Sequence, residues 1–297
     1  QVFEEEALEE ARACDREAAQ GHLRGPLHGI PMGVKDLFFV ADRLCQRGSA
    51  AYKSFAPKAT APIVQRMIDA GSIMIGKTTT TEMGWSGSGH SEFYGPTRNP
   101  WNPELTSGGS SSGSGAALAA RMVPFTLGSD GGGSVRIPAA FCGVFAMKGS
   151  LGRVPTWPWS ATEMLSHAGP MSVSARDSAL LFNIAKGPDP RDHQALPADG
   201  ADYTDPRPIR ALRVGFAPSL FGFAVVPDVD RVIREAVATL SGALDLDIRP
   251  VLLDWQDPIR IFETLWVAGR GVAYGAEADL SAFGSGFRGL VEASARY

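Results

Sequence analysis

The sequence predicts an α/β fold in which helices cover the faces of a β-sheet. Three observations lead to this class. Helical patterns and short apolar runs alternate along most of the chain, which is typical of α/β sheets. Loops rich in glycine, proline, asparagine and serine separate these segments. Finally, 297 residues with 44% hydrophobic content are enough for a sizeable core.

The first part of the chain contains two predicted helices and two predicted strands. Residues 4–19, EEEALEEARACDREAA, have a helical composition, and residues 28–40, HGIPMGVKDLFFV, are expected to form a buried strand interrupted by Lys35 and Asp36. Residues 60–71, TAPIVQRMIDAG, predict a helix with Pro62 in its first turn and Gly71 as its stop. The apolar run SIMIG at 72–76 then predicts a buried strand.

The remaining elements follow the same alternation. Residues 84–115 are rich in loop formers, after which 115–122 (GAALAARM) predict a helix and 123–128 (VPFTLG) a strand. A helix is expected at 175–185, followed by a connection rich in proline and aspartate at 187–208. The last predicted elements, in chain order, are a strand at 211–217, a helix at 227–244 and a strand at 246–253.

The octapeptide GSIMIGKT, residues 71–78, matches the written pattern of a phosphate-binding P-loop. In a P-loop, a strand precedes the pattern and the variable residues form an open loop around phosphate. Here a predicted helix precedes it, and the variable residues Ser72–Ile75 have the character of a buried strand. The sequence therefore favours a sheet strand over a nucleotide site.

Composition excludes several classes of function. A net charge of -4 gives no basic surface for nucleic acid or anionic membranes. The sequence has no apolar run long enough for a membrane span, and its acidic first residues do not resemble a signal peptide. Three scattered cysteines and five histidines without a paired spacing predict neither a disulfide framework nor a metal site. We therefore expect a cytoplasmic protein that uses no cofactor.

Two clusters of serine and glycine indicate chemistry. GGSSSGSG at 108–115 and GSDGGGS at 128–134 flank a predicted helix and strand, and an apolar segment that must pack follows the second cluster. Flexible surface loops are the plainer interpretation of such composition. However, the successive glycines Gly131, Gly132 and Gly133 allow consecutive amides to point at one bound oxygen. An oxyanion hole needs that geometry, with a nucleophile such as Ser134 at its end.

These clusters, together with three further segments in the same order, resemble the amidase signature family of serine hydrolases. The similar segments are GPLHGIPMGVKD at 25–36, AGSIMIGKTTTTEM at 70–83 and GPMSVSARDSALLFNIAKGPDPRD at 169–192. The resemblance extends to about residue 255. It implies a mixed β-sheet flanked by helices on both faces, and a single domain over 1–297. We expect that domain to be incomplete at both ends relative to the family.

The resemblance also implies roles for individual residues. Ser134 matches the nucleophile, Ser110 the bridging serine that follows a cis peptide bond, and Lys35 the base. The amides of Gly131–Ser134 would hold the oxyanion. The positions that would support these groups are Ser111, Ser129, Asp130 and Arg136, and those of the substrate pocket are Met83, Trp85 and Ser86. The implied reaction is hydrolysis of a carboxylic amide through an acyl-enzyme.

Several alternatives remain open at this stage. Within the family, the chain could be an amidotransferase subunit that releases ammonia for a partner acting on charged tRNA, or an incomplete, non-catalytic member. The pentapeptide GSSSG at 109–113 also fits the nucleophile elbow of α/β-hydrolases, with His167 and His193 as possible bases. Asp36 is a second possible base, although a structural role is favoured. The expected partner is a small amide, without direct nucleic-acid or membrane contact, and a homodimer is possible.

Overall fold

The computed structural model describes residues 1–205, 212–276 and 279–297. The chain divides into two compact units, which are described separately. Unit 1 comprises Gln1–Thr204 and Leu265–Tyr297, and unit 2 comprises Asp205–Thr264. The prediction that 1–297 form a single domain stays a prediction.

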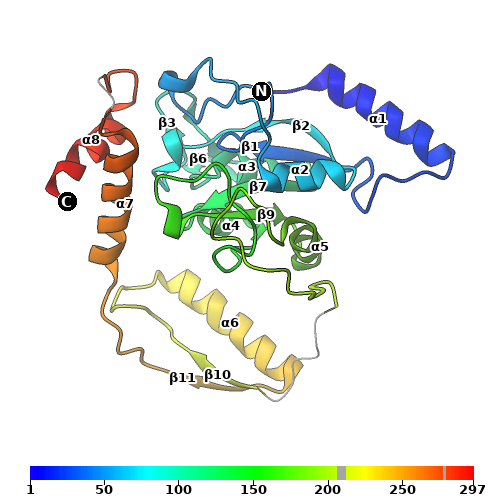
Figure 1. Cartoon of the computed structure of the whole chain (residues 1–297). Coiled ribbons are helices and arrows are strands. Elements are labelled where there is room, and N and C mark those ends of the chain that lie inside the picture. The colour runs from blue at the N-terminus through cyan, green and yellow to red at the C-terminus, as the bar shows by residue number, and fades with distance from the viewer. Residues whose placement is uncertain (206–211, 277–278) are drawn as a thin grey trace. The chain divides into compact units, whose positions relative to one another are not determined.

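A mixed β-sheet forms the centre of unit 1 (Figure 1). Its strands, in spatial order, are β2 (Ile73–Thr78), β1 (Pro31–Lys35), β7 (Phe125–Asp130), β9 (His167–Ser172) and β8 (Phe145–Ala146). Strand β1 runs parallel to both β2 and β7, whereas β9 is antiparallel to β7 and to β8. Because parallel neighbours meet at their carboxyl ends, β1 and β7 bring Lys35 and Ser129 to the same edge.

Helices cover both faces of this sheet, which confirms the predicted fold class. Helices α2 (Pro62–Asp69) and α5 (Ala175–Ala185) pack together over one face, and α3 (Ser112–Ala119) and α4 (Arg136–Cys142) over the other. Alternate strand residues point to opposite faces. Met32 and Leu127 accordingly lie in the core under α2 and α5, whereas Met171 packs with Leu118 of α3.

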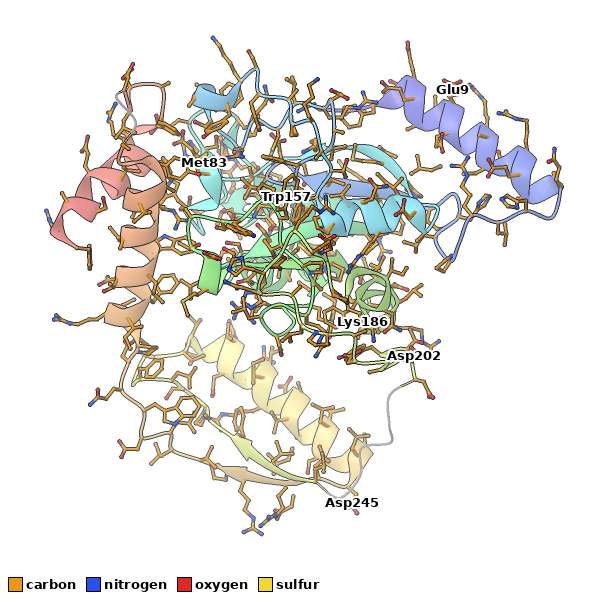
Figure 2. The ribbon with its side chains drawn as sticks, viewed as in Figure 1. Glu9, Met83, Trp157, Lys186, Asp202 and Asp245 are labelled. Atoms are coloured by element: carbon orange, nitrogen blue, oxygen red, sulfur yellow. The ribbon has the colours of Figure 1, made fainter. Side chains whose placement is uncertain are left out.

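Further elements of unit 1 lie around this sandwich. Helix α1 (Glu4–Ala19) contacts β2, and its outer side carries exposed charges such as Glu9 (Figure 2). The short strands are β3 (His90–Ser91), β4 (Gly95–Pro96), β5 (Arg98–Asn99) and β6 (Asn102–Thr106), paired as β3–β4 and β5–β6. Helix α7 (Ile259–Tyr274) enters unit 1 at Leu265, and α8 (Ser285–Ala293) follows it.

Unit 2 is a small β–α–β arrangement. Strands β10 (Arg213–Phe216) and β11 (Asp247–Pro250) pair in parallel, and α6 (Pro227–Leu244) connects them. No described side chain of Asp205–Thr264 is fully buried, since one helix on two strands cannot enclose a core. None of the helices in the described ranges combines the length and apolar character that a membrane crossing needs.

Most predicted elements are present, with shifted ends. The strand expected over 28–40 ends at Lys35, because the chain then turns and the Phe38 amide bonds the Lys35 carbonyl. The helix expected from residue 115 begins at Ser112. Residues 84–115 include the paired strands β3–β6 rather than loops alone. Residues 206–208 of the predicted connection, and residue 211 of the next strand, lie outside the described residues.

Candidate active site

Lys35 is the last residue of β1, and its side chain is completely buried. Its Nζ donates hydrogen bonds to Ser110 Oγ at 2.7 Å and to Ser129 Oγ at 2.9 Å. No described carboxylate forms an ion pair with this amine. Burial therefore lowers the pKa of Lys35 to about 7, although the nearby charge of Asp130 opposes the shift. At neutral pH a substantial fraction of Lys35 is an uncharged amine that can accept a proton.

Ser110 precedes Ser111, the N-cap residue of α3, and only 1% of Ser110 is exposed. The Gly109–Ser110 peptide bond is cis, as the family resemblance implies. The next residue, Ser111, ties this segment to the second serine–glycine cluster. Its amide donates to the Ser134 carbonyl at 3.0 Å, and its hydroxyl donates to the Ser129 carbonyl at 3.2 Å. Both clusters, about twenty residues apart in sequence, thus form one site.

Ser134 follows the glycine turn between β7 and α4. Asp130 braces this turn, because its carboxylate accepts the amides of Gly133 at 2.7 Å and Val135 at 3.3 Å. Arg136 bonds the same carboxylate through Nε and Nη2, both at 2.9 Å. These bonds hold the pKa of Asp130 below its usual value, against the effect of burial. Arg136 is thereby engaged in an ion pair with Asp130.

The backbone amides of the glycine turn differ in their hydrogen-bond partners. The Gly133 amide is occupied by Asp130, so it is not free to bind a developing oxyanion. Within the described residues, the amides of Gly131, Gly132 and Ser134 have no hydrogen-bond partner. The predicted oxyanion donors therefore need one correction: Gly133 supplies the turn, with φ 118°, and the other amides remain available.

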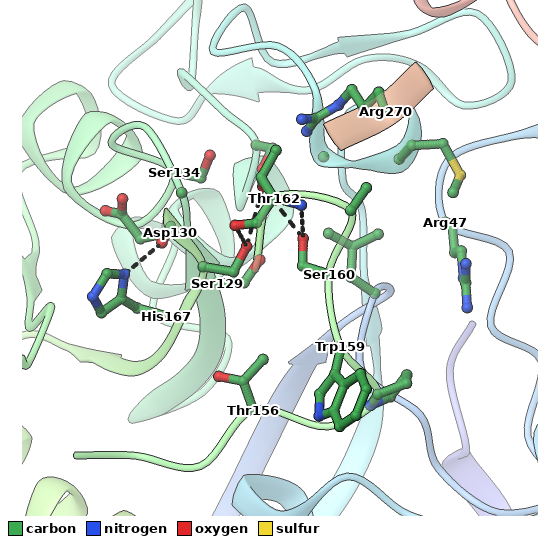
Figure 3. A pocket seen from close by; sticks show the side chains of 18 of the residues that line it. Arg47, Ser129, Asp130, Ser134, Thr156, Trp159, Ser160, Thr162, His167 and Arg270 are labelled. Atoms are coloured by element: carbon green, nitrogen blue, oxygen red, sulfur yellow. Dashed lines mark hydrogen bonds between the residues drawn. The ribbon is translucent and has the colours of Figure 1, made fainter. Parts of the chain in front are cut away.

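A cavity of about 870 Å³, including its open mouth, lies over these groups (Figure 3). Ser110, Ser129 and Ser134 line it, together with Asp130 and Gly131. Its other walls carry aromatic and charged side chains, namely Arg47, Trp157, Trp159, His167, Trp266, Arg270 and Tyr274. This mixture of apolar walls with a few polar groups is typical of small-molecule sites.

Of the three residues predicted to line the substrate pocket, one does so. Met83 lines the cavity, whereas Trp85 and Ser86 do not. Trp85 packs instead against Phe283 and Phe287 near α8, because the left-handed backbone at Met83 and Gly84 turns the chain away. The Ser86 hydroxyl donates to Ser88.

Sequence reasoning missed the contribution of α7. Trp266, Arg270 and Tyr274 line the cavity from this helix, more than 130 residues after Ser134. Their spacing of four residues places them on one helical face. That spacing was a usable signal for a shared face, but not for which cavity the face would line.

The structure bears on the elbow pattern raised by the sequence and on one further possible nucleophile, Cys142. Ser111, the central serine of the elbow pattern, bonds β7 main chain rather than a histidine. His167 does line the cavity, but its Nδ1 contacts the carbonyls of Leu165 and Asp130 at 2.8 and 3.2 Å. Cys142 is fully buried, and burial raises its pKa to about 11. A thiolate nucleophile is therefore disfavoured there.

The P-loop pattern is confirmed as strand material. Residues 73–78 form β2, and Lys77 Nζ donates to the Phe38 carbonyl at 2.7 Å and pairs with Asp36 at 3.3 Å. Asp36 also accepts the Tyr94 hydroxyl at 2.6 Å, which assigns it a structural role.

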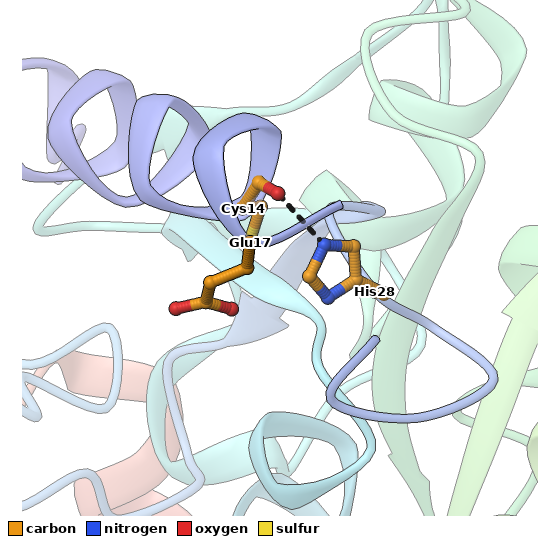
Figure 4. Close-up of side chains that lie close together, drawn as sticks. All are labelled: Cys14, Glu17 and His28. Carbon is orange, nitrogen blue, oxygen red and sulfur yellow. Dashed lines mark hydrogen bonds between the residues drawn. The ribbon is translucent and has the colours of Figure 1, made fainter. Parts of the chain in front are cut away.

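One group of potential metal ligands exists among the described residues, Cys14, Glu17 and His28 (Figure 4). The histidine and the carboxylate are already engaged. His28 Nδ1 accepts the Arg24 amide, and its Nε2 contacts the Cys14 carbonyl at 3.0 Å. Both Glu17 oxygens bond Arg24. The cluster therefore ties α1 to the following loop, and we assign no metal to it.

Comparison with known proteins identifies the family of this chain. The chain matches the Amidase family over residues 1–276. It is 39% identical over 247 residues to a glutamyl-tRNA(Gln) amidotransferase subunit of Chloroflexus aurantiacus, a match that covers 82% of this chain and 51% of that protein. The chain thus spans about half the length of such relatives. It belongs to the amidase family, which confirms the resemblance seen in the sequence.

Two solved structures are similar over nearly the whole chain. A bacterial aryl acylamidase of the amidase signature enzymes has a TM-score of 0.88 at 28% identity, covering 99% of this chain and 64% of that chain. The peptide amidase from Stenotrophomonas maltophilia has a TM-score of 0.79 at 30% identity, and the match covers 97% of this chain and 66% of that chain. The sheet, its helices and the site therefore lie in a fold shared with amide-cleaving enzymes.

Proposed function

We propose that this chain hydrolyses a carboxylic amide through an acyl-enzyme on Ser134. The observation that carries the proposal is the 2.7 Å contact between Ser110 Oγ and a buried Lys35 amine whose pKa burial lowers to about 7. A buried amine without a carboxylate partner is costly as a structural cation. It suits a general base that must be neutral near pH 7.

In the proposed acylation step, Ser134 Oγ attacks the amide carbonyl carbon. Its proton passes to Ser110 Oγ, and the Ser110 proton passes to neutral Lys35 Nζ. The carbonyl oxygen becomes an oxyanion, which the unoccupied amides of Gly131, Gly132 and Ser134 can bind. The relay then runs in reverse and protonates the leaving nitrogen, and the C–N bond breaks. An acyl group remains on Ser134, with ammonia or an amine as the first product.

Deacylation uses the same groups with water. Lys35 and Ser110 remove a proton from the water, whose oxygen attacks the acyl carbon. Collapse of the second tetrahedral species breaks the bond to Ser134 Oγ, which regains its proton. Asp130 and Arg136 keep the glycine turn in place through both steps, and Ser129 fixes the Lys35 amine. The chemistry needs no metal or organic cofactor.

The test is release of ammonia or amine from a panel of aliphatic, aromatic and peptide-like amides. We expect mass spectrometry to detect an acyl adduct in the wild type, and Ser134→Ala to abolish both this adduct and turnover. Ser112→Ala is the matched control, because that hydroxyl makes only a 3.4 Å contact with the Ser110 carbonyl. Turnover that survives Ser134→Ala would exclude Ser134 as the nucleophile.

A second candidate is an amidotransferase subunit that releases ammonia for a partner enzyme. The 39% identity to a glutamyl-tRNA(Gln) amidotransferase subunit favours it. Glutamine-dependent ammonia release should then rise when the partner subunits and charged tRNA are added. The absence of any rise, with other amides still cleaved, would reject this candidate and leave simple hydrolysis.

We also propose a reducing, cytoplasmic location. It is supported by Cys14, Cys45 and Cys142, which are all buried and unpaired. Thiol labelling of unfolded protein taken directly from cells should find all three cysteines reduced, and oxidised cysteines would contradict the proposal.

A further inference from the structure

The peptide group that joins Asp130 to Gly131 lies at the wall of the cavity and is bonded on one side only. Its N–H, the Gly131 amide, has no hydrogen-bond partner within the described residues. Its carbonyl oxygen, on Asp130, contacts the His167 ring at 3.2 Å (Figure 3). The two ends of a peptide group are conjugated, so a hydrogen bond to the oxygen makes the N–H a stronger donor. The environment of His167 therefore bears on a predicted oxyanion donor.

The neighbours of His167 determine which ring nitrogen carries the proton. Nδ1 contacts two carbonyl oxygens, that of Leu165 at 2.8 Å and that of Asp130 at 3.2 Å, and a carbonyl can only accept a hydrogen bond. Nδ1 therefore carries the hydrogen. Nε2 lies 3.4 Å from Lys148 Nζ, and an ammonium can only donate, so Nε2 is the unprotonated nitrogen. The ring is thus a neutral donor toward Asp130.

Three features hold the ring in this state and place. The register of β7 and β9 pairs Asp130 directly with His167, so the ring starts opposite the carbonyl that it bonds. Burial and the adjacent charge of Lys148 lower the pKa of His167, because a second proton on Nε2 would point at the ammonium. Lys148 is itself anchored, since its Nζ donates to the Gly149 carbonyl at 2.9 Å.

These contacts leave His167 unsuited to proton transfer. In the part of the chain that the structure describes, the ring bonds none of the residues of the proposed relay, Lys35, Ser110 and Ser134. The Nδ1 proton is shared between two carbonyls, and Nε2 meets a cation, so neither nitrogen is free to accept a proton from a serine. A contribution of His167 to the reaction must therefore act through the Asp130 carbonyl.

We propose that His167 is a positioning residue that strengthens the oxyanion donor of Gly131. Its Nδ1–H bonds the Asp130 carbonyl, which fixes the plane of the Asp130–Gly131 peptide and increases the polarity of the Gly131 N–H. Asp130 then acts on the glycine turn twice, because its carboxylate holds the Gly133 amide and its carbonyl transmits the His167 bond. This role rests on the proposed hydrolysis of an amide at Ser134.

The first test separates kcat from KM on the whole chain, with the amide that the wild type cleaves best. His167→Leu removes the donor, so kcat should fall at least about tenfold while KM stays within about threefold. His167→Asn places an amide nitrogen at the position of Nδ1, and its kcat should exceed that of His167→Leu by at least about threefold. An unchanged kcat in folded His167→Leu, or a loss confined to KM, would overturn the proposal and leave amide hydrolysis intact.

A transition-state analogue distinguishes positioning from a general structural role. Phenylboronic acid forms a tetrahedral, anionic adduct with a serine hydroxyl, whereas benzoate binds without one. We expect His167→Leu to weaken the boronic acid at least about tenfold and benzoate less than about threefold. His22→Leu is the matched control, since His22 is exposed and outside the cavity, and it should change neither ligand. Equal weakening of both ligands by His167→Leu would assign His167 a structural role and refute the proposal.

Nitrogen NMR of the wild type tests the same geometry without turnover and without a variant that must fold. At pH 7 the His167 ring should show a protonated Nδ1 and a bare Nε2. If no amide is cleaved, the proposed hydrolysis fails, and this spectrum decides separately whether His167 donates to the Asp130–Gly131 peptide. A proton on Nε2 in place of Nδ1 would refute the positioning role even in an active enzyme.

Discussion

Two buried lysines on neighbouring strands show how the environment decides what a lysine does. Lys35 ends β1, and Lys77 lies near the end of β2. The strand register pairs Val34 with Lys77 and Lys35 with Thr78, so the two amines point to opposite faces of the sheet. Lys77 meets the Asp36 carboxylate at 3.3 Å, whereas Lys35 meets the hydroxyls of Ser110 and Ser129.

The difference separates a structural amine from a reactive one. A carboxylate partner forms an ion pair with a buried lysine, and this pair is part of the fold. Hydroxyl partners do not compensate for burial, so the pKa of Lys35 falls to about 7 and its free base becomes accessible. Burial is common to both residues, and the partner decides the role.

The largest expected effect is on catalysis. Lys35→Met removes the proposed base and should lower kcat by about 10³- to 10⁴-fold, because the serine relay then lacks a proton acceptor. The fold should persist, since the change replaces an unpaired buried amine with an apolar chain of similar length. Amine release measures the activity of the variant, and circular dichroism measures whether it folds. Full activity in a folded Lys35→Met protein would show that Lys35, like Lys77, is not the catalytic base.

Lys77→Met should act on stability instead. It leaves the Asp36 carboxylate without its buried cation, which costs about 3–5 kcal/mol of unfolding free energy. Denaturant unfolding measures the loss. Lys77→Met combined with Asp36→Asn should recover part of it, because the uncompensated charge is then removed. A loss below about 1 kcal/mol would show that the ion pair contributes little.

Tyr94→Phe tests the second partner of Asp36. The Tyr94 hydroxyl donates to Asp36 Oδ2 at 2.6 Å, and burial together with this carboxylate raises the pKa of the phenol. Loss of a hydrogen bond to a charged group should cost about 1.5–3 kcal/mol of stability. The kcat of the folded variant should be unchanged, since Tyr94 does not line the cavity. A drop in kcat without a drop in stability would connect Asp36 to catalysis.

The pH dependence is the most specific effect. Because the pKa of Lys35 is about 7 and its neutral form is the base, kcat/KM should fall about tenfold per pH unit below 7 and level off above it. A profile that stays flat down to about pH 5 would exclude neutral Lys35 as the base.

The same pKa shift has a signature in stability. Between pH 7 and the unfolded-state pKa near 10.5, the unfolded chain binds the proton that native Lys35 has lost. The contribution of Lys35 to stability therefore rises with pH across this window and is constant below it. The stability difference between wild type and Lys35→Met isolates this slope, and its absence would contradict the lowered pKa.

Most of the correct predictions of helices and strands came from local sequence patterns. The composition of residues 4–19 predicted α1 to the residue, and 227–244 predicted α6 in the same way. Gly71 was correctly placed after a helix, where its φ of 96° suits glycine. The end of β1 was not predicted, because the apolar residues after Asp36 continue the pattern of a buried strand although the chain turns there.

The sequence by itself determined helices such as α1, α2 and α6, strands such as β2 and β7, the serine–glycine clusters and the lysine that we propose as the base. These depend on local periodicity, turn chemistry and a family resemblance carried by short motifs. The tertiary structure alone decided that Gly133 donates to Asp130, that Trp85 packs away from the cavity, and that α7 contributes Arg270. Such contacts join residues far apart in the chain, where the packing of whole elements sets the geometry and no local pattern encodes it.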